Sequence, residues 1–180
     1  MKLFGELSEE LEREGLRGHV YIVGGAALIA GYGRKRSTHD VDGRIVYEKR
    51  GVMEAASRLA ERHDLPANWL NENATLFMPH KDDSQATTVF NSPALVVTGA
   101  SAKHLLAMKI DAGRAEDIED IQWLLDELRI ESLDEAIEVH RTTYPQSRLP
   151  TTNRKRLEEA FSRRTSCPAA ATTSRRRRGS

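Results

Sequence analysis

The chain has 180 residues, of which 39% are hydrophobic and 30% are charged, with a formal net charge of +0 at pH 7. This length suits one domain with an appendage, and the uncharged stretch at residues 20–33 is too short and too rich in glycine to span a bilayer, so a membrane protein is not expected. The single cysteine, Cys167, cannot form an internal disulfide, and no cleavable signal sequence is recognisable, which favours a cytoplasmic location.

Apolar periodicity predicts short helices and strands in the first half of the chain. Leu3, Leu7 and Leu11 recur every four residues ahead of Gly15, as on one face of an amphipathic helix with a glycine stop. Strands are expected at residues 19–23, 40–47, 87–91 and 94–100, helices at 26–32 and 52–62, and a short helical turn at 66–71.

Helices dominate the second half. Ser101 can cap a helix that ends near Ala112, and Ser132 with Glu135 forms a capping box. Further helices are expected at residues 118–128 and after Pro150. This order predicts an α/β (α+β) fold, with a mixed-sheet core in residues 1–100 and a small helical part in residues 101–164 that completes the site.

The last residues, 165–180, have no apolar pattern and are expected to form a disordered basic tail. From Thr151 onward there are nine Lys or Arg against two Asp or Glu, so this segment carries +7 and the remainder of the chain −7. Such a split hints at a polyanionic partner. The alternative is a solvated tail, or an expression remnant at residues 175–180.

Two carboxylates, Asp40 and Asp42, begin the strand expected at residues 40–47. Because side chains alternate along a strand, both point to one face, with backbones about 7 Å apart. A divalent cation between them would relieve their repulsion, and hard oxygen ligands suit Mg²⁺ or Mn²⁺. The alternative is a pair of solvated side chains at a strand end.

A glycine pair precedes these carboxylates. Gly24 and Gly25 follow a strand and open a helix, where missing side chains and free backbone N–H groups let a phosphate approach. The basic loop that follows adds Arg36 and Ser37 as potential phosphate ligands. The alternative is an ordinary tight turn.

Together these motifs resemble the signature of DNA polymerase β-type nucleotidyltransferases: Gly24-Gly25, fourteen intervening residues, then Asp40-Val41-Asp42. The sequence pattern of this segment is similar to that of AbiEii-like nucleotidyltransferase toxins of toxin–antitoxin systems and their small relatives. A second block resembles a later motif of that family, at Lys109, Ala112, Arg114, Asp117 and Asp120.

The resemblance implies transfer of a nucleoside monophosphate from an NTP to an acceptor hydroxyl, with release of pyrophosphate. It implies metal ligation by Asp40 and Asp42, a third acid at Asp117, and a triphosphate held by Gly24, Gly25, Arg36, Ser37 and Lys109. The implied acceptor is a tRNA or other RNA 3′ end, and a toxin role implies a cognate antitoxin protein.

Several alternatives stay open from the residues alone. The third acid could instead be Asp82 or Asp83, and the charges at Asp111, Arg114, Asp117 and Asp120 could form a surface ion-pair cluster. The acceptor could be a protein hydroxyl or a small molecule. The chain could also be a non-catalytic binding module on a degenerate transferase fold, or a metal-dependent ribonuclease that uses the same carboxylates.

Overall fold

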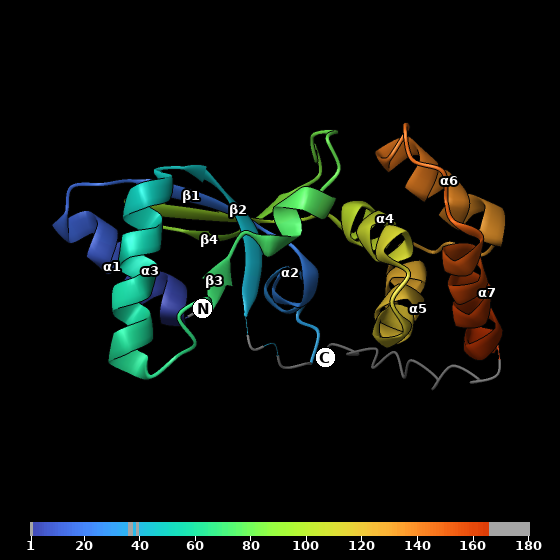
Figure 1. Ribbon diagram of the computed structural model, residues 1–180, viewed down its shortest axis with the longest axis horizontal. Helices are drawn as coiled ribbons and strands as arrows, with labels where there is room; N and C mark the ends of the chain where they lie inside the picture. The colour runs from blue at the N-terminus through green and yellow to red at the C-terminus, as the bar shows by residue number, and fades with distance from the viewer. Residues whose placement is uncertain (1, 36–37, 39, 166–180) are drawn as a thin grey trace, which may run out of the picture.

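The computed structural model describes residues 2–35, 38 and 40–165 (Figure 1). An α/β half lies at one end of the long axis and a helical half at the other. The elements, in chain order, are α1 (Lys2–Arg13), β1 (Gly18–Ile22), α2 (Gly24–Tyr32), β2 (Val41–Tyr47), α3 (Lys49–His63), β3 (Leu70–Asn71), the 3₁₀ helix η1 (Asn73–Phe77), β4 (Thr87–Asn91), β5 (Leu95–Gly99), α4 (Ala102–Ala112), the 3₁₀ helix η2 (Ala115–Asp117), α5 (Ile118–Glu127), α6 (Leu133–Thr143) and α7 (Thr151–Thr165).

The strands form one mixed sheet in the order β3-β2-β1-β5-β4. Strand β1 pairs antiparallel with β2 and parallel with β5. The outer pairs are parallel for β2 with β3 and antiparallel for β4 with β5. The expected α/β class, with a mixed-sheet core followed by helices, is therefore confirmed.

Three helices cover one face of this sheet. A Cβ added to Gly18 of β1 would lie 2.6 Å from Val52 of α3 and 3.1 Å from Leu11 of α1, and one added to Gly99 of β5 would lie 4.0 Å from Ala27 of α2. The opposite face is more open: it carries the half-buried side chains of β1 and β5 that alternate with the buried ones.

Gly43 follows the carboxylate pair in β2, at a position where strands usually carry a bulkier residue. It pairs with Ile22 of β1, and a Cβ at this position would lie only 2.7 Å from the carbonyl oxygen of Tyr21. Only glycine lets β1 and β2 approach this closely, so this residue fixes the distance between the strand that carries Asp42 and the centre of the sheet.

The helical half packs α4 against α5, α6 and α7. Its caps match the sequence analysis: the Ser101 hydroxyl accepts from the His104 N–H at 3.3 Å, and the Ser132 hydroxyl accepts from the Glu135 N–H at 3.2 Å. Gly113 closes α4 in the left-handed conformation, at φ 58°. No helix of the described residues is long and apolar enough to cross a membrane.

The helical turn expected at residues 66–71 is wrong in its second half. Pro66 and Trp69 close a turn, with the Trp69 N–H bonded to the Pro66 carbonyl at 2.9 Å, but Leu70 and Asn71 then form β3 along β2. The tail expected at residues 165–180 lies outside the described residues from position 166 onward, while Thr165 ends α7.

Candidate active site

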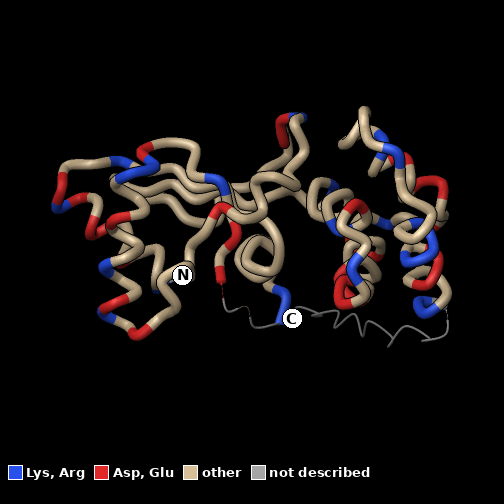
Figure 2. The backbone as a smooth tube through the Cα atoms, in the orientation of Figure 1, with Lys and Arg blue, Asp and Glu red and all other residues tan. Residues whose placement is uncertain are grey.

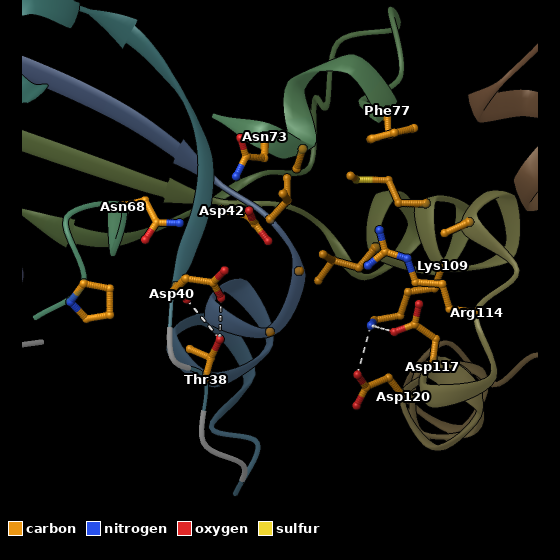
Figure 3. A pocket seen from close by; sticks show the side chains of 18 residues that line it. Thr38, Asp40, Asp42, Asn68, Asn73, Phe77, Lys109, Arg114, Asp117 and Asp120 are labelled. Carbon is orange, nitrogen blue, oxygen red and sulfur yellow. Dashed lines mark hydrogen bonds and ion pairs between the residues drawn. The ribbon is translucent and has the colours of Figure 1, made fainter. Parts of the chain in front are cut away.

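A cavity of about 800 Å³ separates the sheet from the helical half. Its wall on the sheet side comes from the turn between β1 and α2, from the start of β2 and from η1. Its wall on the helical side comes from α4 and from the segment that leads into α5. Figure 3 shows the polar side chains of both walls pointing toward the space between them.

The two predicted carboxylates lie together on the sheet side. Asp42 lies within β2 and is half-buried. Asp40 directly precedes the first residue of β2 and is exposed. The Thr38 hydroxyl donates to the Asp40 carbonyl at 2.9 Å and approaches its carboxylate at 3.3 Å. Asn71, which is paired with Asp42 in the β2–β3 register, places a buried amide beside it. The sequence analysis missed Asn71, because only the short β3 pairing brings it here.

Burial raises the pKa of the Asp42 carboxyl above its ordinary value, and the nearby charge of Asp40 raises it further. A hydrogen bond from Asn71 and the positive charge of Arg114 lower it only in part. Asp42 therefore carries a charge that its protein surroundings do not fully stabilise, which is typical of a residue that serves a function.

The glycine pair adjoins these carboxylates. Gly24 has φ 61°, a conformation that favours glycine, and a Cβ there would lie 3.8 Å from an oxygen of Asp42. A Cβ on Gly25 would lie 3.5 Å from Thr38. Val23 occupies the N-cap position of α2 and has no side-chain acceptor for the first N–H groups of that helix. The turn thus leaves backbone donors next to the carboxylates, as the sequence predicted.

The helical side presents one face of α4, where Leu105, Met108, Lys109 and Ala112 follow helical spacing. The Lys109 ammonium lies 2.6 Å from a carboxylate oxygen of Asp117 and 2.9 Å from one of Asp120. The Lys109 side chain is only 11% exposed, so this is an enclosed ion pair and not a surface one. Lys109 and Asp117 therefore meet across the short α4–α5 connection, as expected.

Arg114 is the exposed cation of this wall. Among the residues that the structure describes, no acidic group lies within 4.0 Å of its guanidinium. Figure 3 shows Arg114 and Lys109 on the same side of the cavity, across from Asp42. Arg114 belongs to the second sequence block, but the sequence alone gave it no individual role, because its surroundings depend on the tertiary structure.

Residues 1–163 match the family described as nucleotidyltransferase of unknown function (DUF6036). The chain belongs to this family. No curated protein and no solved structure shows significant similarity to it. The match supports the nucleotidyltransferase resemblance at the level of the superfamily. It does not reach the AbiEii-like toxins, so that finer assignment stays a prediction.

Not all acids named for this DUF6036 chain reach the cavity. Asp83 lines a separate cavity of about 260 Å³ on the open sheet face, where its carboxylate accepts from the Tyr21 hydroxyl at 2.9 Å and from the Ser101 N–H at 2.7 Å. Asp82 lines that second cavity too. Of the three candidates for the third acid, only Asp117 shares a cavity with Asp42.

Three other predicted positions complete the comparison. Asp111 pairs with His140 at 2.8 Å, away from the main cavity, so it does not belong to an ion-pair cluster with Asp117. Arg36 and Ser37 lie outside the described residues, and their role as phosphate ligands stays a prediction.

The sheet-side wall of the DUF6036 site has two carboxylates, Asp40 and Asp42. The described residues contain no group of three or more His, Cys, Asp or Glu that could hold a metal ion, so a cation here would rely on these two carboxylates together with other ligands. This fits Mg²⁺ or Mn²⁺, which proteins commonly bind through one or two carboxylates together with water and substrate phosphates. The incompletely stabilised charge of Asp42 beside Asp40 is the observation that favours a cation there.

Proposed function

We propose that this member of the nucleotidyltransferase family transfers a nucleoside monophosphate from an NTP to an acceptor hydroxyl and releases pyrophosphate. One observation carries the proposal: the glycine turn and the carboxylate pair line a single cavity with a cationic wall that comes from a distant part of the chain. Each part alone is common in proteins, but their convergence matches what a phosphate-bearing substrate needs.

Asp40 and Asp42 would hold Mg²⁺ or Mn²⁺. When bound, the metal would neutralise charge on the attacking oxygen, the leaving oxygen and the phosphates. The contribution of the chain is to position both carboxylates at the rim of the sheet, where Thr38 contacts Asp40 and Asn71 contacts Asp42.

The triphosphate would lie between the two walls. Backbone N–H groups at Gly24 and Gly25 would bind it from the sheet side, together with Arg36 and Ser37. Arg114 would bind it from the helical side, because its guanidinium has no acidic group within 4.0 Å among the described residues and can donate to two phosphate oxygens at once. Lys109 would reach it only by giving up part of its present ion pair.

Proton removal from the acceptor hydroxyl would fall to Asp42 or Asp117. Asp117 accepts a hydrogen bond from Lys109 at 2.6 Å, and both residues line the cavity that contains Asp42. This contact holds the Asp117 carboxylate in the cavity wall, which supports Asp117 in this role.

The acceptor is proposed from the family resemblance of the motifs. A tRNA or other RNA 3′ end would be the acceptor, and a toxin role would add a cognate antitoxin as protein partner. The other two candidates are a non-catalytic binding module and a metal-dependent ribonuclease.

One experiment separates these functions. The chain is incubated with Mg²⁺, each labelled NTP in turn and total RNA. Nucleotidyl transfer predicts label gained by RNA, a binding module predicts RNA retained but unchanged, and a ribonuclease predicts shortened RNA. Asp42→Asn should abolish the gain of label, whereas Asp82→Asn, an exposed carboxylate outside the main cavity, should not.

A further inference from the structure

The main cavity has an apolar wall that the phosphate-binding groups do not use. Phe77, from η1, lines it together with Leu105 and Met108 of α4. The Phe77 side chain is 63% exposed, which is unusual for an aromatic residue in a chain with a well-packed core. An exposed ring at the edge of a cavity is available to a flat ligand.

The main chain around Phe77 is held firmly. Its carbonyl oxygen accepts from the Tyr144 hydroxyl at 2.7 Å, and Met78, the next residue, is buried. At the other end of η1, the Glu72 carboxylate accepts from the Ile45 N–H of β2 at 2.9 Å. Because both ends of η1 are fixed to the fold, the main chain that carries the ring is already in place before a ligand binds.

The position of the ring relative to the charges suggests its ligand. Figure 3 shows Phe77, Lys109 and Arg114 on one side of Asp42, with Asn68 on the other. A triphosphate held by Arg114 and the glycine turn would therefore carry its base toward the Phe77 side. The end of the cavity near Asn68 would remain for the acceptor.

We propose that Phe77 is the stacking platform for the base of the incoming nucleotide, with Leu105 and Met108 forming the rest of an apolar base pocket. This inference rests on the proposed nucleotidyl transfer. Stacking on an aromatic ring is largely independent of base identity, so the platform provides affinity for nucleosides in general and does not select among the bases.

The test compares two ligands in the presence of Mg²⁺, an NTP and inorganic tripolyphosphate, which lacks base and sugar. Their affinities are measured by calorimetry for wild type, Phe77→Ala, Phe77→Trp and Leu76→Ala. Leu76 is the matched control, because it is the preceding residue in η1 and 89% exposed but does not line the cavity.

Phe77→Ala should weaken NTP binding roughly 5- to 150-fold, the usual range for one base–aromatic stack, and leave tripolyphosphate binding unchanged. Phe77→Trp should retain NTP affinity, and Leu76→Ala should match wild type for both ligands. Equal NTP affinity in Phe77→Ala and wild type would overturn the platform while leaving the transfer proposal intact. Failure of wild type to bind either ligand would overturn both.

Discussion

At the scale of single residues, Asp42 has the clearest functional signature. Its pKa is raised because its carboxyl is partly buried and lies near Asp40, so the charged form is held at a cost in folding free energy. A partly buried carboxylate beside a second carboxylate does not contribute to packing. A positively charged ligand would lower the free-energy cost of its charge, which explains its position better.

We predict that Asp42→Ala and Asp40→Ala each reduce nucleotidyl transfer by about 10²-fold or more, the usual loss when a positioned electrostatic group is removed. Asp42→Ala should not lower the thermal midpoint, because it removes an incompletely stabilised charge. Transfer rates and thermal unfolding are measured on the same samples. Full activity in Asp42→Ala at an equal folded fraction would show that the site is assigned wrongly.

A second prediction concerns Arg114, whose guanidinium has no acidic partner within ion-pair distance among the described residues. Arg114→Ala should change the free energy of unfolding by no more than about 0.5 kcal/mol, as surface substitutions usually do. NTP affinity should fall about tenfold or more, since hydrogen bonds between charged groups contribute roughly 1.5–3 kcal/mol.

Arg17→Ala is the control for Arg114→Ala, because Arg17 is also exposed and lines neither cavity. It should leave both the stability and the NTP affinity unchanged. If Arg114→Ala unfolds the protein or keeps full NTP affinity, the cationic wall does not bind phosphate through this residue.

At the scale of elements, α1 is joined to α3 by a cluster of charges around Glu10. The Glu10 carboxylate accepts from Arg13 at 2.6 Å and Arg58 at 3.1 Å, and it also contacts Arg62. These contacts, with the hydrogen bond from Arg62 the largest, lower the pKa of Glu10 from 4.5 to about 2. The three arginines are 37–58% exposed, so solvent screens the cluster.

We predict that Glu10→Gln lowers the free energy of unfolding at pH 7 by about 1–2 kcal/mol. Because the pKa of Glu10 is lower in the folded than in the unfolded state, its stabilisation is present above pH 4.5 and is lost as the pH falls toward 2. The difference between wild type and variant, measured by urea unfolding, should therefore shrink over that range.

Glu9→Gln serves as the control, since Glu9 is 66% exposed and lies 3.7 Å from Arg13. Its effect on stability should be close to zero at every pH. A difference between wild type and Glu10→Gln that stays constant from pH 5 to pH 2 would mean that Glu10 acts through packing and not through its charge.

Most elements were predictable because their signals are local. Glycine stops, the Ser101 cap and the apolar spacing of α1 are read within one or two turns of chain. Residues 66–77 were not: β3 has two residues and exists only through its pairing with β2, and η1 is fixed by contacts to β2 and Tyr144. The same holds for Asn71, which β3 places beside Asp42, and for Phe77, which lines the cavity through η1.

At the scale of the whole molecule, the candidate site joins two halves of the chain. The sheet half supplies the glycine turn and the carboxylate pair, and the helical half supplies the cations. The sequence predicted that these two motifs contribute to one site, because both resemble motifs of the same family. It could not separate Asp117 from Asp83 as the third acid, because that depends on which cavity each one faces.

The final prediction concerns the charge of the C-terminal segment. In α7, Arg154, Arg156 and Arg163 already pair with acids of the same helix, and Figure 2 shows acidic and basic positions mixed along it. The four arginines at residues 175–178 lie outside the described residues, and they are consecutive in the sequence with no acidic residue among them. They are therefore the better candidates for contacts with RNA phosphates.

Removal of the residues after Thr165 should weaken RNA binding and lower the slope of log affinity against log salt by roughly 3 to 4 units if all four arginines contact phosphate. Transfer to a minimal acceptor at saturation should persist, since the cavity lies wholly before residue 121. The measurement is RNA affinity at several salt concentrations for the full and the shortened chain. Equal slopes for the full and shortened chains would exclude the tail as an RNA contact.

The enclosed pairing of Lys109 with Asp117 and Asp120 also bears on how the cavity discriminates among anions. Both carboxylates belong to the same chain as the lysine, so they compete with an incoming anion at a high effective concentration. A lone inorganic phosphate would have to displace them in exchange for few new contacts. A nucleotide can bind first at the glycine turn and Arg114, and only then share Lys109. The ion pairs of Lys109 with Asp117 and Asp120 therefore disfavour small anions, and they favour ligands such as nucleotides that also bind elsewhere in the cavity.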